Sequence, residues 1–240
     1  MSKAGGCQFA VLLADGYSLL PGKVQGQTWK REAMTAEVTG LGDCWAEHLP
    51  TGLQKVTLTQ SGAFFDDTAS GVHALLSGSQ TTSRVFNFAI AGNTLGKAMF
   101  GHTGTYQSSY AVMGEQGGLT KANTDYTVTG QGDVGVILST HAAHTVTYTE
   151  TSVDNAASSA NGGVGYLQVS AYATLTNAIW KIQSSANNST WADLITFATV
   201  TSGPTAERKT CAGTVDRYLR VVGTLSGSGS VTAFVGFARG

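Results

Sequence analysis

Three groups of residues have the types and spacing from which chemistry is built: a glycine-rich turn, a histidine pair and two adjacent carboxylates. Gly130, Gly132 and Gly135 match the G-x-G-x-x-G pattern of dinucleotide-binding loops. That pattern needs a helix after the glycines, whose N-terminus receives the pyrophosphate. Here the strand-like run Val-Ile-Leu-Ser-Thr follows instead. We therefore interpret the glycines as a hairpin turn and expect no nucleotide cofactor.

The histidines and carboxylates also favour structural roles. His141 and His144 lie three residues apart, but a zinc site takes three or four ligands, and Glu150 is the nearest acidic residue. We expect this pair to lie in a turn. Asp66 and Asp67 are adjacent, so in a strand they would point to opposite faces, and a helix cap explains them better. No nucleophile-elbow motif is present. We expect no catalytic site, no metal and no cofactor, and hence not an enzyme.

The composition predicts a mainly β protein. The chain has 240 residues with 31 Gly, 3 Pro and only 12% charged residues, about half the usual share. Such a chain favours short strands joined by glycine turns. With a net charge of −1, the chain lacks the excess of Lys and Arg that is typical of nucleic-acid-binding proteins. Residues 1–150 carry 8 Lys+Arg and 11 Asp+Glu (net −3), and residues 151–240 carry 6 and 4 (net +2).

Cysteine usage and hydropathy suggest a cytosolic product. Cys7, Cys44 and Cys211 are odd in number and far apart, so we expect reduced, buried thiols. No run approaches the roughly 18 apolar residues that a membrane helix needs, and the N-terminus does not resemble a signal peptide. We expect no membrane insertion.

Two domains are expected from the pattern of strands. Residues 1–153 contain several strands and a single good helix signal, in which Val72, Leu75 and Leu76 fall on one face. Residues 154–165 are small and polar, as in a linker. Residues 166–240 contain six candidate strands about ten residues apart, which predicts a small β-sandwich of jelly-roll or carbohydrate-binding-module type.

The segment Gly40–Asp67 is the most informative part of the chain. A loop with Gly-Asp and Leu-Pro-x-Gly-Leu leads into an alternating strand, Lys55–Phe65, which closes on Gly-Ala-Phe-Phe-Asp. This order of loop, strand and helix resembles the major tail (tail tube) proteins of long-tailed, siphovirus-type bacteriophages. The resemblance extends over about residues 8–150 and is densest in this segment.

The resemblance implies a tail-tube β-sandwich or barrel with one flanking helix. It also implies six-subunit rings whose inner strands close a barrel, and stacked rings that form a channel through which DNA passes without specific binding. The implied partners are further copies of the chain and the tape measure, tail terminator and distal tail proteins. The implied location is the virion tail, after assembly in the cytoplasm of the bacterial host.

Residue roles follow from the resemblance as expectations. Candidates for contacts between rings or subunits are the apolar residues of the loop and the strand end: Leu41, Trp45, Leu49, Phe64 and Phe65. Candidates for the channel lining are Glu32 and Glu37, which in an unbroken strand would face opposite sides.

The second domain leaves alternatives open. Trp191 and Tyr218 are candidate contacts for host-surface glycans, although aromatic residues more often pack in cores. A carbohydrate-binding or adhesion protein is therefore one alternative function. A capsid decoration protein, which would not polymerise into tubes, is the other.

Overall fold

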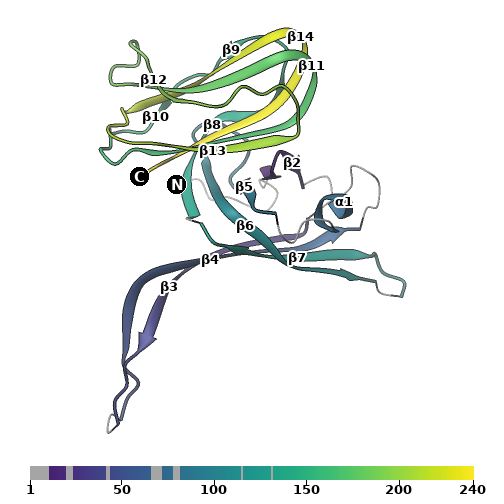
Figure 1. Cartoon of the computed structure of the whole chain (residues 1–240), viewed down its shortest axis with the longest axis vertical. Helices are drawn as coiled ribbons and strands as arrows, with labels where there is room; N and C mark the ends of the chain where they lie inside the picture. The colour runs from purple at the N-terminus through teal and green to yellow at the C-terminus, as the bar shows by residue number, and fades with distance from the viewer. Residues whose placement is uncertain are drawn as a thin grey trace. The chain divides into compact units, whose positions relative to one another are not determined.

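The computed structural model of the chain describes residues 11–19, 24–41, 44–65, 72–77, 82–114, 116–130 and 132–240. The protein is mainly β, as the composition predicts, and the strand pairings with a defined register are antiparallel (Figure 1). A short helix, α1 (Val72–Ser77), lies where the sequence predicts one, whereas the expected cap at Asp66 and Asp67 lies outside the described residues.

The strands are β1 (Val11–Ala14), β2 (Tyr17–Ser18), β3 (Gly26–Glu37), β4 (His48–Phe64), β5 (Arg84–Ala89), β6 (Ala98–Met113), β7 (Lys121–Val128), β8 (Gly132–His144), β9 (Tyr148–Thr149), β10 (Val153–Asp154), β11 (Gly163–Ser185), β12 (Ala192–Thr196), β13 (Thr205–Cys211) and β14 (Tyr218–Arg239).

The chain divides into two compact units that are each discontinuous in sequence. The larger unit comprises residues 1–21, 84–103 and 133–240, and the smaller unit comprises residues 22–83 and 104–132. This division differs from the expected one at residues 154–165. Those residues are hydrogen-bonded within the larger unit, because Val153 and Asp154 pair with β14 and Ser159 forms a bridge with Val215.

Two long strands dominate the larger unit. β11 and β14 pair antiparallel from Gly163↔Arg239 to Ser185↔Tyr218, with register shifts between Val169 and Asn177. These irregularities let each strand bend, so four of the strands expected from the sequence are halves of two continuous ones. The main core of the unit is apolar and includes the fully buried Trp180, Leu219 and Val235.

The smaller unit contains a sheet in the order β3-β4-β7-β6. Its two faces differ, because Val56, Leu58 and Gln60 of β4 are buried while the intervening Thr57 and Thr59 are not. On the buried face, the side chain of Gln107 donates a hydrogen bond to the carbonyl of Leu76 in α1 (Nε2–O, 2.8 Å).

The glycine-rich turn between β7 and β8 is not the hairpin that the sequence suggested. β7 pairs with β4 and β6, and β8 pairs with β6 and β14, so the two strands do not pair with each other. A strand does follow the glycines, in place of the helix that a dinucleotide site requires.

Candidate assembly surface

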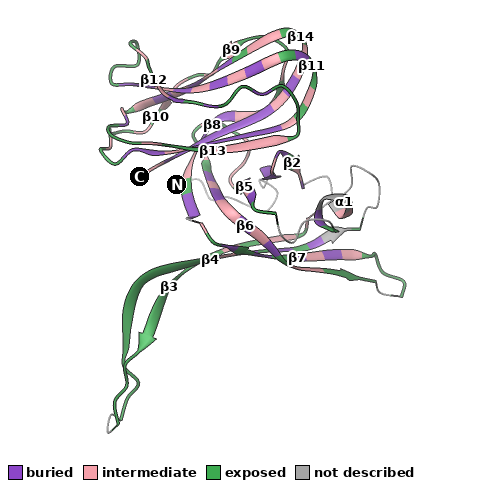
Figure 2. Ribbon diagram, in the orientation of Figure 1, coloured by how far each residue is buried: buried purple, intermediate pink, exposed green. Residues whose placement is uncertain are grey.

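A long two-stranded hairpin is the most unusual feature of the smaller unit. β3 and β4 pair from Gly26↔Ser61 to Glu37↔His48, whereas β4 pairs with β7 only between Val56 and Phe64. Residues 33–55, here called the distal hairpin, therefore extend beyond the sheet. Figure 2 shows this ribbon exposed on both faces.

The hairpin contains a bulge in a segment for which the sequence predicted a loop. Ala33 pairs with Gln54 and Thr35 with Pro50, so the bulge inserts extra residues into β4. Gly52 adopts a φ of 76° there, and the hydroxyl of Thr51 donates to the carbonyl of Met34 (2.8 Å). Gly40–Gly52 was expected to be a loop, but β4 begins at His48, because an exposed edge ribbon tolerates a proline and a bulge.

Three apolar contact candidates lie on the distal hairpin and face water. The exposed fraction is 111% for Leu41 and 87% for Trp45, and Leu49 is also exposed. Met34, Val38 and Leu53 add further exposed apolar side chains to the same ribbon. A concentration of large apolar groups on a ribbon without a core is typical of a protein interaction site.

The other two contact candidates lie at the opposite end of β4. Phe65 is exposed, and its ring centroid lies 4.7 Å from that of His73. His73 in turn shares a hydrogen bond with Tyr110 (Nδ1–Oη, 2.7 Å). Phe64 ends β4, but its side chain lies outside the described residues.

Both channel-lining candidates lie on β3 and are exposed. The carboxylate of Glu32 forms an ion pair with Lys30 (Oε1–Nζ, 2.6 Å), which lowers the pKa of Glu32. Lys55 lies directly opposite Glu32 in the register. Glu37 lies beyond the bulge, opposite His48, and accepts a hydrogen bond from Thr39 (3.0 Å).

The exposed face of the four-stranded sheet is polar and carries charges of both signs. It is here called the channel-side face because it holds the channel-lining candidate Glu32. By the alternation of the strands, it carries three lysines and two carboxylates: Lys30, Lys55, Lys121, Glu32 and Asp125. Its other side chains are short and polar, and they include Thr28, Thr57, Thr59, Asn123 and Thr127.

The aromatic glycan candidates of the larger unit are covered by arginines. The guanidinium of Arg220 lies 4.1 Å from the ring centroid of Trp191, and that of Arg217 lies 5.0 Å from the ring of Tyr218. Both rings are half-buried. A cation on the ring face occupies a position that a stacked sugar would need.

Buried polar groups in the larger unit form structural contacts. Asp133 accepts hydrogen bonds from the Tyr166 hydroxyl and from Arg208, and Arg208 also donates to Tyr166 (Nε–Oη, 3.1 Å). His141 and His144 lie in β8 rather than in the expected turn. His141 bonds to Ser170 (2.7 Å), and the ring of His144 stacks on Tyr148.

Among the described residues, no group of three or more His, Cys, Asp or Glu side chains is arranged to hold a metal ion. In the same part of the chain, no helix has the length and hydropathy to cross a membrane. The expectation of buried thiols is wrong for Cys44, which is exposed on the distal hairpin, while Cys211 is half-buried. Cys7 lies outside the described residues.

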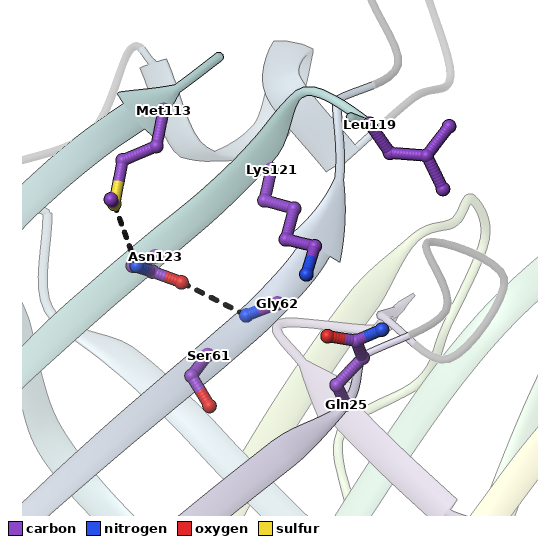
Figure 3. Close-up of a pocket in the computed structure, with 7 residues that line it drawn as sticks. All are labelled: Gln25, Ser61, Gly62, Met113, Leu119, Lys121 and Asn123. Carbon is purple, nitrogen blue, oxygen red and sulfur yellow. Dashed lines mark hydrogen bonds between the residues drawn. The ribbon is translucent and has the colours of Figure 1, made fainter. Parts of the chain in front are cut away.

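A hollow that the sequence did not predict lies at the end of the smaller unit's sheet opposite the distal hairpin. This end pocket has a volume of about 270 Å³ and is lined by Gln25, Ser61, Gly62, Met113, Leu119, Lys121 and Asn123 (Figure 3). Its residues come from three separate segments of the chain, so no single stretch of sequence marks it. Gly62 lies there with a φ of 71°.

Comparison with known proteins gives structural similarities with low sequence identity and low TM-scores. The sequence matches no family model and no curated protein. The structure is similar to a chain in the tail of an empty gene transfer agent particle with C6 symmetry (15% identity, 54% of this chain, 97% of that chain, TM-score 0.37). It is also similar to a chain of a native gene transfer agent virion (14% identity, 55% and 98% coverage, TM-score 0.39). A third similarity is to the Dit protein of phage SPP1, from a hub adsorption apparatus (12% identity, 95% and 98% coverage, TM-score 0.37).

Proposed function

We propose that this chain is a structural protein of a long-tailed phage, which assembles with its own copies into stacked hexameric rings that form the tail tube. The observation that carries the proposal is the distal hairpin, a ribbon of exposed apolar side chains. Among the described residues of its unit, no third strand pairs with β4 on the hairpin side of Val56. This hairpin spans most of Gly40–Asp67, the segment that resembles tail tube proteins.

The β3 edge of the smaller unit's sheet suits lateral assembly. In the part of the chain that the structure describes, β3 pairs with β4 alone, whereas β6 pairs with β5 and β8 as well as with β7. An open edge presents unpaired backbone donors and acceptors to another chain. Pairing of the β3 edge in one copy with a different surface of the next copy is a heterologous contact, which closes into a ring when the rotation per copy fits.

The channel-side face suits a conduit for DNA. Tight binding to phosphates needs uncompensated Lys and Arg side chains. On this face Glu32 lies beside Lys30 and opposite Lys55, and the threonines offer short neutral side chains. The two carboxylates offset two of the three lysines, which leaves one net positive charge per copy and limits the attraction of the face for DNA.

The remaining parts of the proposal follow the sequence resemblance. The tape measure, tail terminator and distal tail proteins are its partners, and the tail forms in the bacterial host cytoplasm before it becomes part of the virion. The larger unit, which contains residues 166–240, decorates the tube. A function as an adhesion protein finds less support, because arginines cover the rings of Trp191 and Tyr218.

Electron microscopy of the concentrated protein tests this function, with Trp45→Ala as the decisive variant. The unaltered protein should form hollow rings or tubes. Trp45→Ala should stop tube growth and change the free energy of unfolding by less than about 0.5 kcal/mol, because the side chain is exposed. Val146→Ala, at another exposed apolar residue in the larger unit, is the matched control and should assemble normally. Tubes of Trp45→Ala indistinguishable from the control would contradict the proposal.

A further inference from the structure

The end pocket is built into the backbone of the smaller unit. The register of β4 against β7 shifts between Gln60 and Ala63, and the N–H of Gly62 donates to the side chain of Asn123 (N–Oδ1, 2.9 Å). Asn123 also donates to the sulfur of Met113 (3.4 Å), so its side chain links β4 to β6 at the pocket (Figure 3). A Cβ atom at position 62 would come within 2.6 Å of Gln25.

The rim of the end pocket combines polar groups with two exposed apolar side chains. Met113 and Leu119 have exposed fractions of 52% and 63%, although each borders the hollow. Lys121 supplies the only charge among the lining residues and projects beside Gly62 in Figure 3. Methionine adapts its shape to an incoming group and makes favourable contacts with aromatic rings.

The distal hairpin and the end pocket occupy opposite ends of the same pair of strands. β4 begins at His48, next to the hairpin tip (residues 38–47), and ends at Phe64, two residues after Gly62 of the pocket. β3 begins at Gly26, directly after Gln25 of the pocket, and ends at Glu37. When identical copies associate head to tail, the tip of one copy meets the pocket end of the next.

The two surfaces are chemically complementary. The tip presents Leu41, Trp45 and the exposed carboxylate of Glu47. The pocket presents the apolar side chains of Met113 and Leu119 with the ammonium group of Lys121. Tryptophan anchors that enter a pocket carry much of the binding energy at protein interfaces. We propose that the end pocket is the acceptor for the hairpin tip of a second copy of this chain, with Trp45 as the anchor. This inference rests on the proposed function, because it assigns the contact that joins successive rings.

Disulfide cross-linking tests the assignment, because the tip already carries an exposed thiol at Cys44. Leu119→Cys places a second thiol on the rim of the pocket, in a Cys7→Ser background. Cys44 and position 119 lie at opposite ends of one sheet, whereas a disulfide needs Cα atoms within about 7 Å, so the bond can form only between copies. Oxidation of the assembled variant should give a ladder of covalent multimers that a reductant collapses.

Two control variants make the outcome specific. Cys44→Ser combined with Leu119→Cys should lose the ladder, and Val146→Cys, at an exposed site in the larger unit, should give none. Tubes that form without a ladder from Leu119→Cys would overturn the assigned acceptor and leave the proposed function intact. An equal ladder from Val146→Cys would also overturn the assignment. A protein that stays monomeric at every concentration would overturn the proposed function and the assignment together.

Discussion

The guanidinium of Arg208 lies 3.0 Å from the carboxylate of Asp133, and the two side chains are 18% and 5% exposed. Removal of one partner from such a pair leaves an uncompensated buried charge, which costs about 3 kcal/mol or more. Arg208→Met should therefore lower the free energy of unfolding by about 3 kcal/mol, measured by urea denaturation in dilute solution. A loss below about 1 kcal/mol would show that water already solvates Asp133.

A double variant at positions 133 and 208 separates the effect of the buried charge from the effect of lost packing. Asp133→Asn combined with Arg208→Met removes both charges, so it should be more stable than Arg208→Met alone. Tyr166 keeps a hydrogen-bond acceptor at position 133 in this variant, because the asparagine carbonyl replaces the carboxylate oxygen. Equal stability of the single and double variants would mean that the buried charge is not the source of the loss.

The buried imidazole of His102 should make the larger unit sensitive to acid. Its side chain is fully buried near the rings of Phe86 and Phe88, and burial lowers the pKa of His102 to about 4, against an opposing effect of Asp133. The folded protein therefore binds fewer protons than the unfolded chain between about pH 6.5 and pH 4. The stabilisation is complete above pH 6.5 and is lost as the pH falls toward 4, by about 3 kcal/mol.

His102→Leu isolates this effect. The variant should match or exceed the stability of the unaltered protein at pH 7.5, because both ring nitrogens of His102 lack hydrogen-bond partners. Its urea midpoint should fall less between pH 7.5 and pH 4.5. Some dependence should remain, since burial also lowers the pKa of His141 and His144. An unchanged pH dependence would exclude His102 as the acid-sensitive group.

Gly135 should not tolerate substitution by a residue with a side chain. A Cβ atom at this position of β8 would lie 2.2 Å from the carbonyl oxygen of Phe237 in the neighbouring strand. Gly135→Ala should therefore destabilise the protein by about 2 kcal/mol or more, as measured by the thermal midpoint. Gly114→Ala is the control, because the nearest atom to its Cβ is 3.8 Å away, at Thr120, and its effect should stay within about 0.5 kcal/mol. Equal effects would contradict this explanation of the conspicuous glycine spacing.

Removal of a carboxylate from the channel-side face should increase DNA binding. Glu32→Gln removes the carboxylate between Lys30 and Lys55. The variant should bind a short duplex more tightly than the unaltered protein in fluorescence anisotropy, with a steeper salt dependence. Glu47→Gln, which makes the same charge change at the hairpin tip, should have a smaller effect. If the two variants bind alike, then overall charge and not this face determines affinity.

The sequence predicted the strand pattern and the apolar residues of the hairpin. It did not predict the bends of β11 and β14 or the end pocket. Alternation of Val56 and Leu58 with Thr57 and Thr59 reports local backbone geometry, so it predicted the second half of β4. Thr174 has a φ of 56° within β11, a local irregularity that interrupted the expected pattern and split one strand into two. The end pocket joins Gly62 to Asn123, a contact fixed by the register of β4 and β7 rather than by neighbouring residues.

In the described part of its unit, the distal hairpin has no third strand beside it, and this has a kinetic consequence. A two-stranded ribbon is only marginally stable in water, and fixing each residue costs about 1–2 kcal/mol of conformational free energy. If copies join through the end pocket as proposed, a copy that adds to a tube meets a pocket that is already held in place, whereas two free copies have no such template. Assembly should therefore show a lag phase that preformed seeds abolish.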